Sequence, residues 1–132
     1  MTIQELYQSA LSMVNVPTGQ GDTEDYEERA PYLAAAFCTE AQDTDNALRA
    51  ATGEPVAPQF NAVYIPLDSE FPLLDVFSVA ASLYLAAMLI IDEDEELSDK
   101  IYERYCDEMS RLSERIPCAT ESIADRYSFR GR

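Results

Sequence analysis

The chain has 132 residues, enough for one domain with a hydrophobic core, and it carries a formal net charge of −16 and no histidine. The missing histidine excludes Cys-His nucleophilic sites and zinc sites that need a histidine ligand. The negative charge argues against sequence-specific DNA binding, because carboxylates repel phosphates. It fits solubility, docking on a basic partner, or the lining of a passage through which DNA slides without sticking.

The acidic residues are unevenly distributed along the chain. Residues 1–100 contain 19 acidic residues against three basic ones, whereas residues 101–132 contain six acidic residues and six arginines. Two dense acidic runs occupy residues 22–28 and 92–96. Neither run has the spaced acids and central glycine of an EF-hand loop, so both are interpreted as solvated helix ends. No spacing selects a pair of carboxylates for hydrolysis, and we expect no enzyme activity and no cofactor.

Two amphipathic helices are predicted in the first half of the chain. Thr2 and Glu5 form a capping box, and apolar residues then recur every three or four positions up to about Asn15. A second helix is predicted to open near Thr23 and to end by Gly53. Pro31 lies within its apolar stripe and is expected to kink the helix or to mark a break.

The segment from Gly53 to Pro72 contains four prolines and a β-prone run from Phe60 to Ile65. One interpretation is a short strand that pairs with another segment or with another subunit, because its backbone groups need hydrogen-bond partners. The simpler interpretation is an extended loop packed over the core. Phe60, Val63 and Ile65 are the candidate interface residues of this segment.

A helical hairpin is predicted in the second half. The stretch from about Leu73 to Ile91 is apolar on almost every side and is interpreted as the central core helix. Its apolar run, residues 76–91, has 16 residues, fewer than the roughly 20 that a membrane span needs. An acidic turn leads into an amphipathic helix from about Glu95 to Arg115. A signal peptide has a basic segment followed by an apolar stretch at the N-terminus, and the sequence does not show this pattern there. We therefore expect a cytoplasmic protein without a signal peptide.

The predicted fold is therefore mainly α. It is one small domain, residues 1–132, of four to five helices, with an extended or short β segment at about 54–67 between the second and third helices. Cys38, Cys106 and Cys118 are odd in number and far apart, as is typical of a reducing compartment. Each is interpreted as a small buried apolar residue.

Residues 120–132 are predicted to form a C-terminal tail that becomes ordered only against a partner. In this tail apolar and aromatic side chains alternate with arginines, a combination typical of interface anchors. The candidate anchors are Ile123, Arg126, Tyr127, Phe129 and Arg130.

Residues 60–127 show an order of packing motifs that resembles the small head-tail connector (adaptor) proteins of tailed phages and prophages. A proline-bounded β-prone segment precedes an apolar helix, an acidic turn, a tyrosine-bearing helix and a short C-terminal element. The residues that carry the resemblance are Ile65, Leu67, Asp68 and Glu70; Tyr84, Leu85, Ala86, Ala87 and Leu89; Asp92–Asp94; Tyr102, Tyr105, Met109 and Leu112; and Ile123, Asp125 and Tyr127. The first two helices fit the family more loosely.

The resemblance implies a structural subunit that forms a ring, commonly of twelve copies, beneath the portal protein at the capsid vertex. Such a ring extends the DNA channel and links the head to a stopper or tail-completion protein, so DNA passes through without specific binding. The implied location is the neck of the virion, after assembly in the bacterial cytoplasm. The candidate channel residues are Asp92, Glu93, Asp94 and Glu95.

The main alternative is an acidic DNA-mimic inhibitor of a nucleic-acid enzyme. The net charge fits this function equally well. The balanced charge of the last third and its arginine-rich tip fit it less well, because a mimic gains from acidic residues spread along one whole face. A regulatory or toxin-neutralising partner is a third class, for which the sequence offers no specific support.

Overall fold

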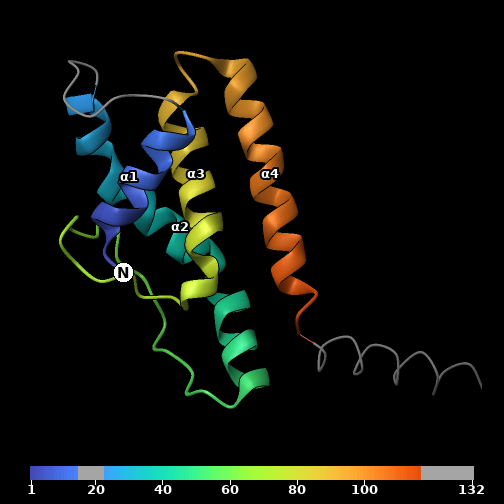
Figure 1. The fold of residues 1–132 in the computed structure, drawn as a ribbon. Helices are drawn as coiled ribbons and strands as arrows, with labels where there is room; N and C mark the ends of the chain where they lie inside the picture. The colour runs from blue at the N-terminus through green and yellow to red at the C-terminus, as the bar shows by residue number, and fades with distance from the viewer. Residues whose placement is uncertain (15–22, 117–132) are drawn as a thin grey trace, which may run out of the picture.

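The computed structural model describes residues 1–14 and 23–116, which form four α-helices and one long loop (Figure 1). The helices are α1 (Ile3–Met13), α2 (Thr23–Thr52), α3 (Ser78–Ile90) and α4 (Glu95–Ser113), and a 3₁₀ turn, η1 (Asp75–Phe77), leads into α3. The prediction of a mainly α protein is confirmed. The described residues contain no strand, and their one isolated β-bridge joins Thr2 to Glu70.

Helix α1 begins at the predicted capping box. The Thr2 hydroxyl accepts a hydrogen bond from the Glu5 backbone N–H at 3.3 Å, and the Glu5 carboxylate accepts one from the Thr2 backbone N–H at 3.2 Å. The next two free N–H groups, those of Ile3 and Gln4, donate to loop carbonyls at 3.0 and 2.8 Å. The helix start therefore holds the long loop in place as well as its own first turn.

Helix α2 continues past Pro31 without a break, so the predicted break at this residue is absent. A proline inside a helix removes one backbone hydrogen bond. Buried residues on both sides of Pro31, among them Tyr26, Ala34 and Phe37, press the two halves of α2 against the same core. We infer that this continuous burial offsets the lost bond. The Pro31 carbonyl also accepts a hydrogen bond from the Ile65 N–H at 3.2 Å.

The segment between α2 and η1 is the extended loop of the simpler interpretation, not a strand in the described chain. Side chains of α2 satisfy its backbone groups. The Gln42 side chain accepts from the Phe60 N–H at 2.6 Å and donates to the Phe60 carbonyl at 3.0 Å, and the Asn46 side chain accepts from the Ala57 N–H at 3.1 Å. These bonds hold the loop against α2 without a neighbouring strand.

A buried carboxylate fixes the end of this loop. Asp45 in α2 is fully buried, and its two oxygens accept hydrogen bonds from the Leu74 N–H and from the Arg49 guanidinium, each at 2.9 Å. The Leu74 backbone is held in an extended conformation. Helix α3 therefore starts at Ser78, after η1, and not at Leu73 as predicted.

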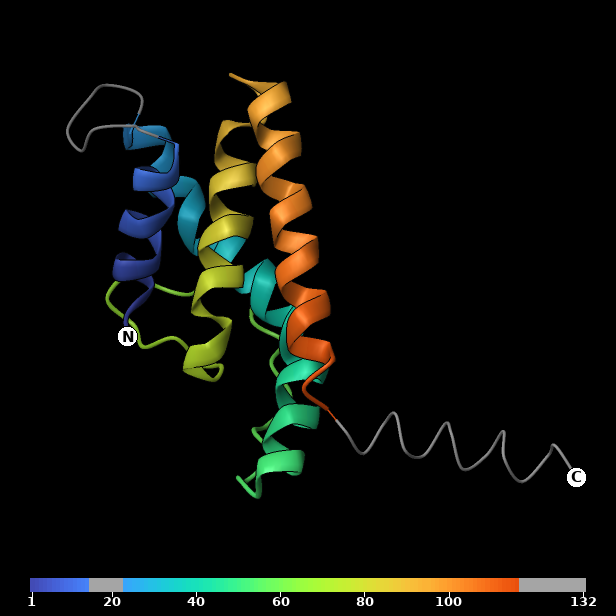
Figure 2. The same ribbon diagram turned by 45° about the vertical axis from the view of Figure 1, so that its right-hand side comes forward.

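Helix α3 is the centre of the protein, as predicted. It packs against α1, α2 and α4, and it lies between α1 and α4 in both views of the fold (Figures 1 and 2). Nine of its thirteen residues are buried. The predicted stripe of α4 faces it, with Ile101, Tyr105 and Leu112 buried. Burial on this scale supplies the main favourable free energy of folding.

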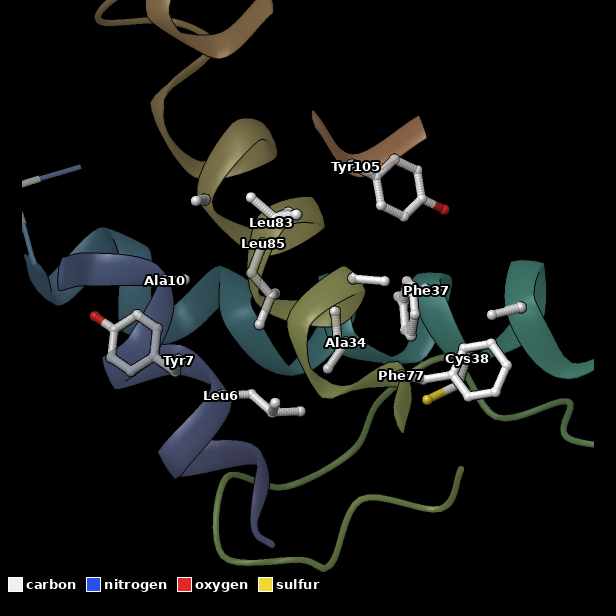
Figure 3. Packing of buried hydrophobic residues seen from close by; sticks show 14 of the residues in the cluster. Leu6, Tyr7, Ala10, Ala34, Phe37, Cys38, Phe77, Leu83, Leu85 and Tyr105 are labelled. Carbon is white, nitrogen blue, oxygen red and sulfur yellow. The ribbon is translucent and has the colours of Figure 1, made fainter. Parts of the chain in front are cut away.

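Phe37 of α2 occupies the middle of an aromatic cluster. Figure 3 shows Phe37 and Tyr105, two members of this cluster, among the buried residues. Its ring centroid lies 5.9 Å from that of Tyr84, 6.1 Å from that of Tyr105 and 6.3 Å from that of Phe71. The Tyr105 hydroxyl donates to the Glu40 carboxylate at 3.0 Å, and burial together with this bond raises the pKa of Tyr105. Tyr84 and Tyr105 thus help to pack the core.

The two cysteines that the structure describes differ from each other. Cys38 is buried, as predicted, and burial, with a smaller contribution from Asp45, raises the pKa of its thiol to about 12. Cys106 is exposed on α4, so the prediction of a buried residue was wrong there. The apolar stripe of α4 passes through Tyr105, and the next position along the helix turns away from it. Cys118 lies outside the described residues.

None of the helices in residues 1–14 and 23–116 is both long enough and apolar enough to cross a membrane.

Replacing Leu85 by Asp tests the central position of α3. Leu85 has no exposed surface, so the variant would place an unpaired charge in the core, at a cost of about 4 kcal/mol or more in unfolding free energy. Val79→Asp is the matched control, because Val79 lies on the same helix and is 49% exposed. Chemical denaturation should show a large loss for the first variant and a small change for the second. Equal stability of the two variants would contradict the core assignment.

Candidate functional site

Part of the first acidic run of the sequence lies near the second run at one end of the protein. The start of α2 lies beside the end of α3, because the Arg29 guanidinium donates to the Met88 carbonyl at 2.9 Å and the Tyr26 hydroxyl donates to the Glu93 carboxylate. Tyr26 and Glu93 are 67 positions apart in the chain. Asp25, at the start of α2, is therefore brought close to the acidic turn between α3 and α4, at the top of Figure 1. We call this surface, Asp25 with Asp92–Glu96, the acidic end.

The candidate channel residues are all exposed, but they do not have the same role. The Asp94 carboxylate caps α4 by accepting from the Leu97 N–H at 3.0 Å, and Glu93 accepts from the buried Tyr26 hydroxyl. Asp92 and Glu95 make no side-chain hydrogen bond or ion pair with the described part of the chain. Two of the four carboxylates therefore stabilise the turn, and two contribute charge alone.

The exposed face of α4 carries charges of both signs. Lys100 lies 3.9 Å from Glu96, and Arg111 makes a 2.6 Å ion pair with Glu108. Arg104 lies on the same helix and, with Asp107, Glu108 and Arg111, borders a surface pocket. The dense negative charge of residues 92–96 thus does not continue along α4.

A second surface feature lies on the side of α1. An open pocket of ≈ 810 Å³ forms between the first turn of α1, the early part of α2 and the loop at residues 64–68. The rings of Tyr32 and Tyr64 meet edge to face on its wall, with centroids 5.0 Å apart, and they remain 56% and 46% exposed. The rest of the described lining consists of Gln4, Glu27, Glu28, Pro31, Pro66, Leu67 and Asp68. We call this feature the tyrosine pocket.

The three loop residues predicted as interface contacts occupy different environments. Ile65 is 6% exposed and belongs to the core, so it is not an interface residue of the folded chain. Phe60 is half-buried and held by Gln42, whereas Val63 is 77% exposed. The tail candidates Ile123, Arg126, Tyr127, Phe129 and Arg130 lie outside the described residues. The structure adds Tyr64 as a further exposed residue of this loop. Neighbouring side chains of an extended segment point in opposite directions, so Tyr64 is exposed where Ile65 is buried. This alternation of side-chain direction could have been foreseen from the sequence.

No group of three or more Asp, Glu, Cys or His side chains within residues 1–14 and 23–116 is arranged to hold a metal ion. Each buried side-chain nitrogen and oxygen in the same residues has a hydrogen-bond partner. The described part of the chain thus gives no buried polar group aimed at a small ligand.

Comparison with models of known protein families, with curated proteins and with solved structures finds no match for this chain. Function is therefore inferred from the chemistry and arrangement of its own residues, together with the resemblance in the sequence described above.

Charge reversal at Glu93 and at Asp92 should separate the two roles of the acidic turn. Glu93→Lys removes the acceptor of the Tyr26 hydroxyl and should lower the unfolding free energy by about 1–3 kcal/mol. Asp92→Lys changes the charge by the same amount on the same exposed turn and should have almost no effect. Thermal unfolding of both variants is the measurement, and a Glu93→Lys variant as stable as Asp92→Lys would contradict the proposed tether.

Proposed function

We propose that this protein is a head-tail connector (adaptor) subunit of a tailed phage or prophage. In this proposal it assembles as a ring, commonly of twelve copies, beneath the portal protein and joins the head to a stopper or tail-completion protein. Its location is the neck of the virion, and it acts as a structural protein and not as an enzyme. The observation that carries the proposal is the dense acidic turn, residues 92–96, at one end of a helical subunit, to which the start of α2 with Asp25 is bonded through Tyr26 and Arg29.

The acidic end suits the wall of a DNA channel. A ring places the same end of each subunit around a common axis, so the carboxylates of Asp25, Asp92 and Glu95 would repeat around the lumen. DNA phosphates are repelled from such a wall, in which the cations Arg29 and Lys100 are each paired with a carboxylate, Asp25 and Glu96. The ring would extend the portal channel without holding the DNA that passes through it.

Contacts between copies would use side chains more than backbone pairing. The Phe60 backbone is already hydrogen-bonded to Gln42, and the Ile65 N–H to Pro31, so a strand shared between copies would have to break these bonds. Val63 and Tyr64 are exposed beside them and can pack on a neighbour without that cost. We therefore propose that this loop contacts a neighbouring subunit through its side chains. A strand shared between the two copies is the less favoured form of this contact.

The mixed charge of α4 favours a connector over a DNA mimic. A mimic imitates two rows of phosphates and needs negative charge along an extended face. On α4 the cations Lys100, Arg104 and Arg111 interrupt that charge. An end that is dense in carboxylates, followed by a helix of mixed charge, instead suits a subunit with one side toward DNA and other sides toward proteins.

Size-exclusion chromatography with light scattering tests the proposal directly. The full-length protein, alone and with the portal protein of the same phage, should give a mass of many subunits in at least one of the two conditions. A connector ring on the portal should also remain bound at moderate salt, because its contacts are partly apolar.

The same experiment has a contrary outcome. A protein that stays a monomer or dimer at all concentrations and never binds portal would remove the connector proposal. Inhibition of a restriction or repair nuclease by that small species, competed by DNA, would support the mimic in its place.

A further inference from the structure

We propose that the tyrosine pocket is the receptor for the arginine- and aromatic-rich C-terminal segment, residues 123–132, of a neighbouring copy of this chain. The proposal deepens the ring proposed above and rests on it, because the donor is another subunit. In this arrangement the tyrosine pocket of each copy holds the C-terminal segment of the next copy.

The pocket is held in shape by bonds that come from three parts of the chain. The Gln4 N–H donates to the Leu67 carbonyl at 2.8 Å, and the Ile65 N–H donates to the Pro31 carbonyl at 3.2 Å. Tyr32 and Tyr64 meet edge to face above these bonds. A receptor that is already ordered loses little conformational entropy when it binds a peptide.

The chemistry of the pocket matches that of the segment. Glu27, Glu28 and Asp68 border the pocket, and its described lining includes no basic residue. Exposed tyrosine and proline rings form its apolar surface. The segment contains Ile123, Arg126, Tyr127, Phe129, Arg130 and Arg132. Arginine pairs with carboxylates and stacks on aromatic rings, and aromatic side chains pack on tyrosine and proline, so both kinds of group find partners.

The geometry favours a neighbouring copy as the donor. In both views of the fold, α1 and the end of α4 lie on opposite sides of α3 (Figures 1 and 2). The C-terminal end of α4 therefore lies on the side away from the pocket. The 16 residues after Ile116 can span up to about 50 Å, enough to cross to an adjacent subunit. A contact in which each copy gives a segment and receives one is of the type that closes into rings.

Peptide binding tests the pocket without requiring a ring. The probe is a fluorescent peptide with the sequence of residues 119–132, and the receptor is the full-length Arg126→Ala, Arg130→Ala variant, whose own segment should not compete. Tyr64→Ala in this receptor should weaken binding about tenfold or more, as expected for an aromatic anchor. Val56→Ala is the matched control, because Val56 is 60% exposed and lies outside the pocket, and it should leave the affinity unchanged.

Charge exchange makes the test specific to the carboxylates. Glu27→Lys with Glu28→Lys in the receptor should weaken binding of the natural peptide. The receptor with these two lysines should instead bind a peptide that carries Arg126→Glu and Arg130→Glu. No binding of the natural peptide, or binding that none of the pocket substitutions changes, would overturn the proposal.

Mixing two full-length variants tests whether the donor is a neighbouring copy. One variant lacks the donor charges (Arg126→Ala, Arg130→Ala), and the other lacks the receptor (Glu27→Lys, Glu28→Lys, Tyr64→Ala). Sedimentation velocity should show each alone as a monomer and the mixture as a 1:1 complex. Failure of the mixture to associate, or assembly of either variant alone to the size of the unmodified protein, would overturn the proposal.

The two proposals fail in distinguishable ways. If the protein forms rings that bind portal but the peptide does not bind the pocket, the connector function is supported and this inference is wrong. Specific peptide binding and a 1:1 complex of the two variants, without any portal binding, would support the pocket and remove the connector function.

Discussion

Burial of α3 is the interaction on which the rest of this structure depends. The helix offers apolar or small side chains on nearly every side, and α1, α2 and α4 each cover part of it. A helix of this kind cannot remain at a surface, so the other three helices are arranged around it. The aromatic cluster around Phe37 then joins α2 to both α3 and α4 on one side of the bundle.

The position of the charged and binding surfaces follows from that packing. The end of α3 leads directly into the acidic turn, and the start of α2, which carries the other acidic run, is bonded to the same end through Arg29 and Tyr26. At the other side of α3, α1 and the loop that it holds build the tyrosine pocket. Two surfaces of different character thus arise on one small core, one formed by the acidic turn and one in which exposed tyrosines lie beside carboxylates.

The elements that the sequence predicts well are those with a regular apolar period. The capping box, the stripe of α4 and the apolar α3 each specify an element through residues close in the chain. The loop between α2 and η1 is different, because its path depends on Gln42, Asn46 and Asp45, whose side chains reach backbone groups up to 29 positions away. A β-prone run such as residues 60–65 cannot reveal that its hydrogen bonds are taken by a helix.

The arrangement of the candidate site also depends on contacts between residues that are far apart in the sequence. The acidic runs are visible in the sequence, but the position of Asp25 near the second run depends on contacts between α2 and α3 across the core. The tyrosine pocket is harder still to foresee, since Tyr32 and Tyr64 come together only when Ile65 is buried beside Pro31. Cys106 is exposed although it directly follows the buried Tyr105, so a shift of one position along an amphipathic helix can decide whether a residue is buried.

Single-particle electron microscopy of the protein bound to its portal would test the central claim most directly. The claim predicts a closed ring coaxial with the portal, in which the turn at residues 92–96 of each copy faces the channel. A ring whose acidic turns point outward, away from the axis, would contradict it.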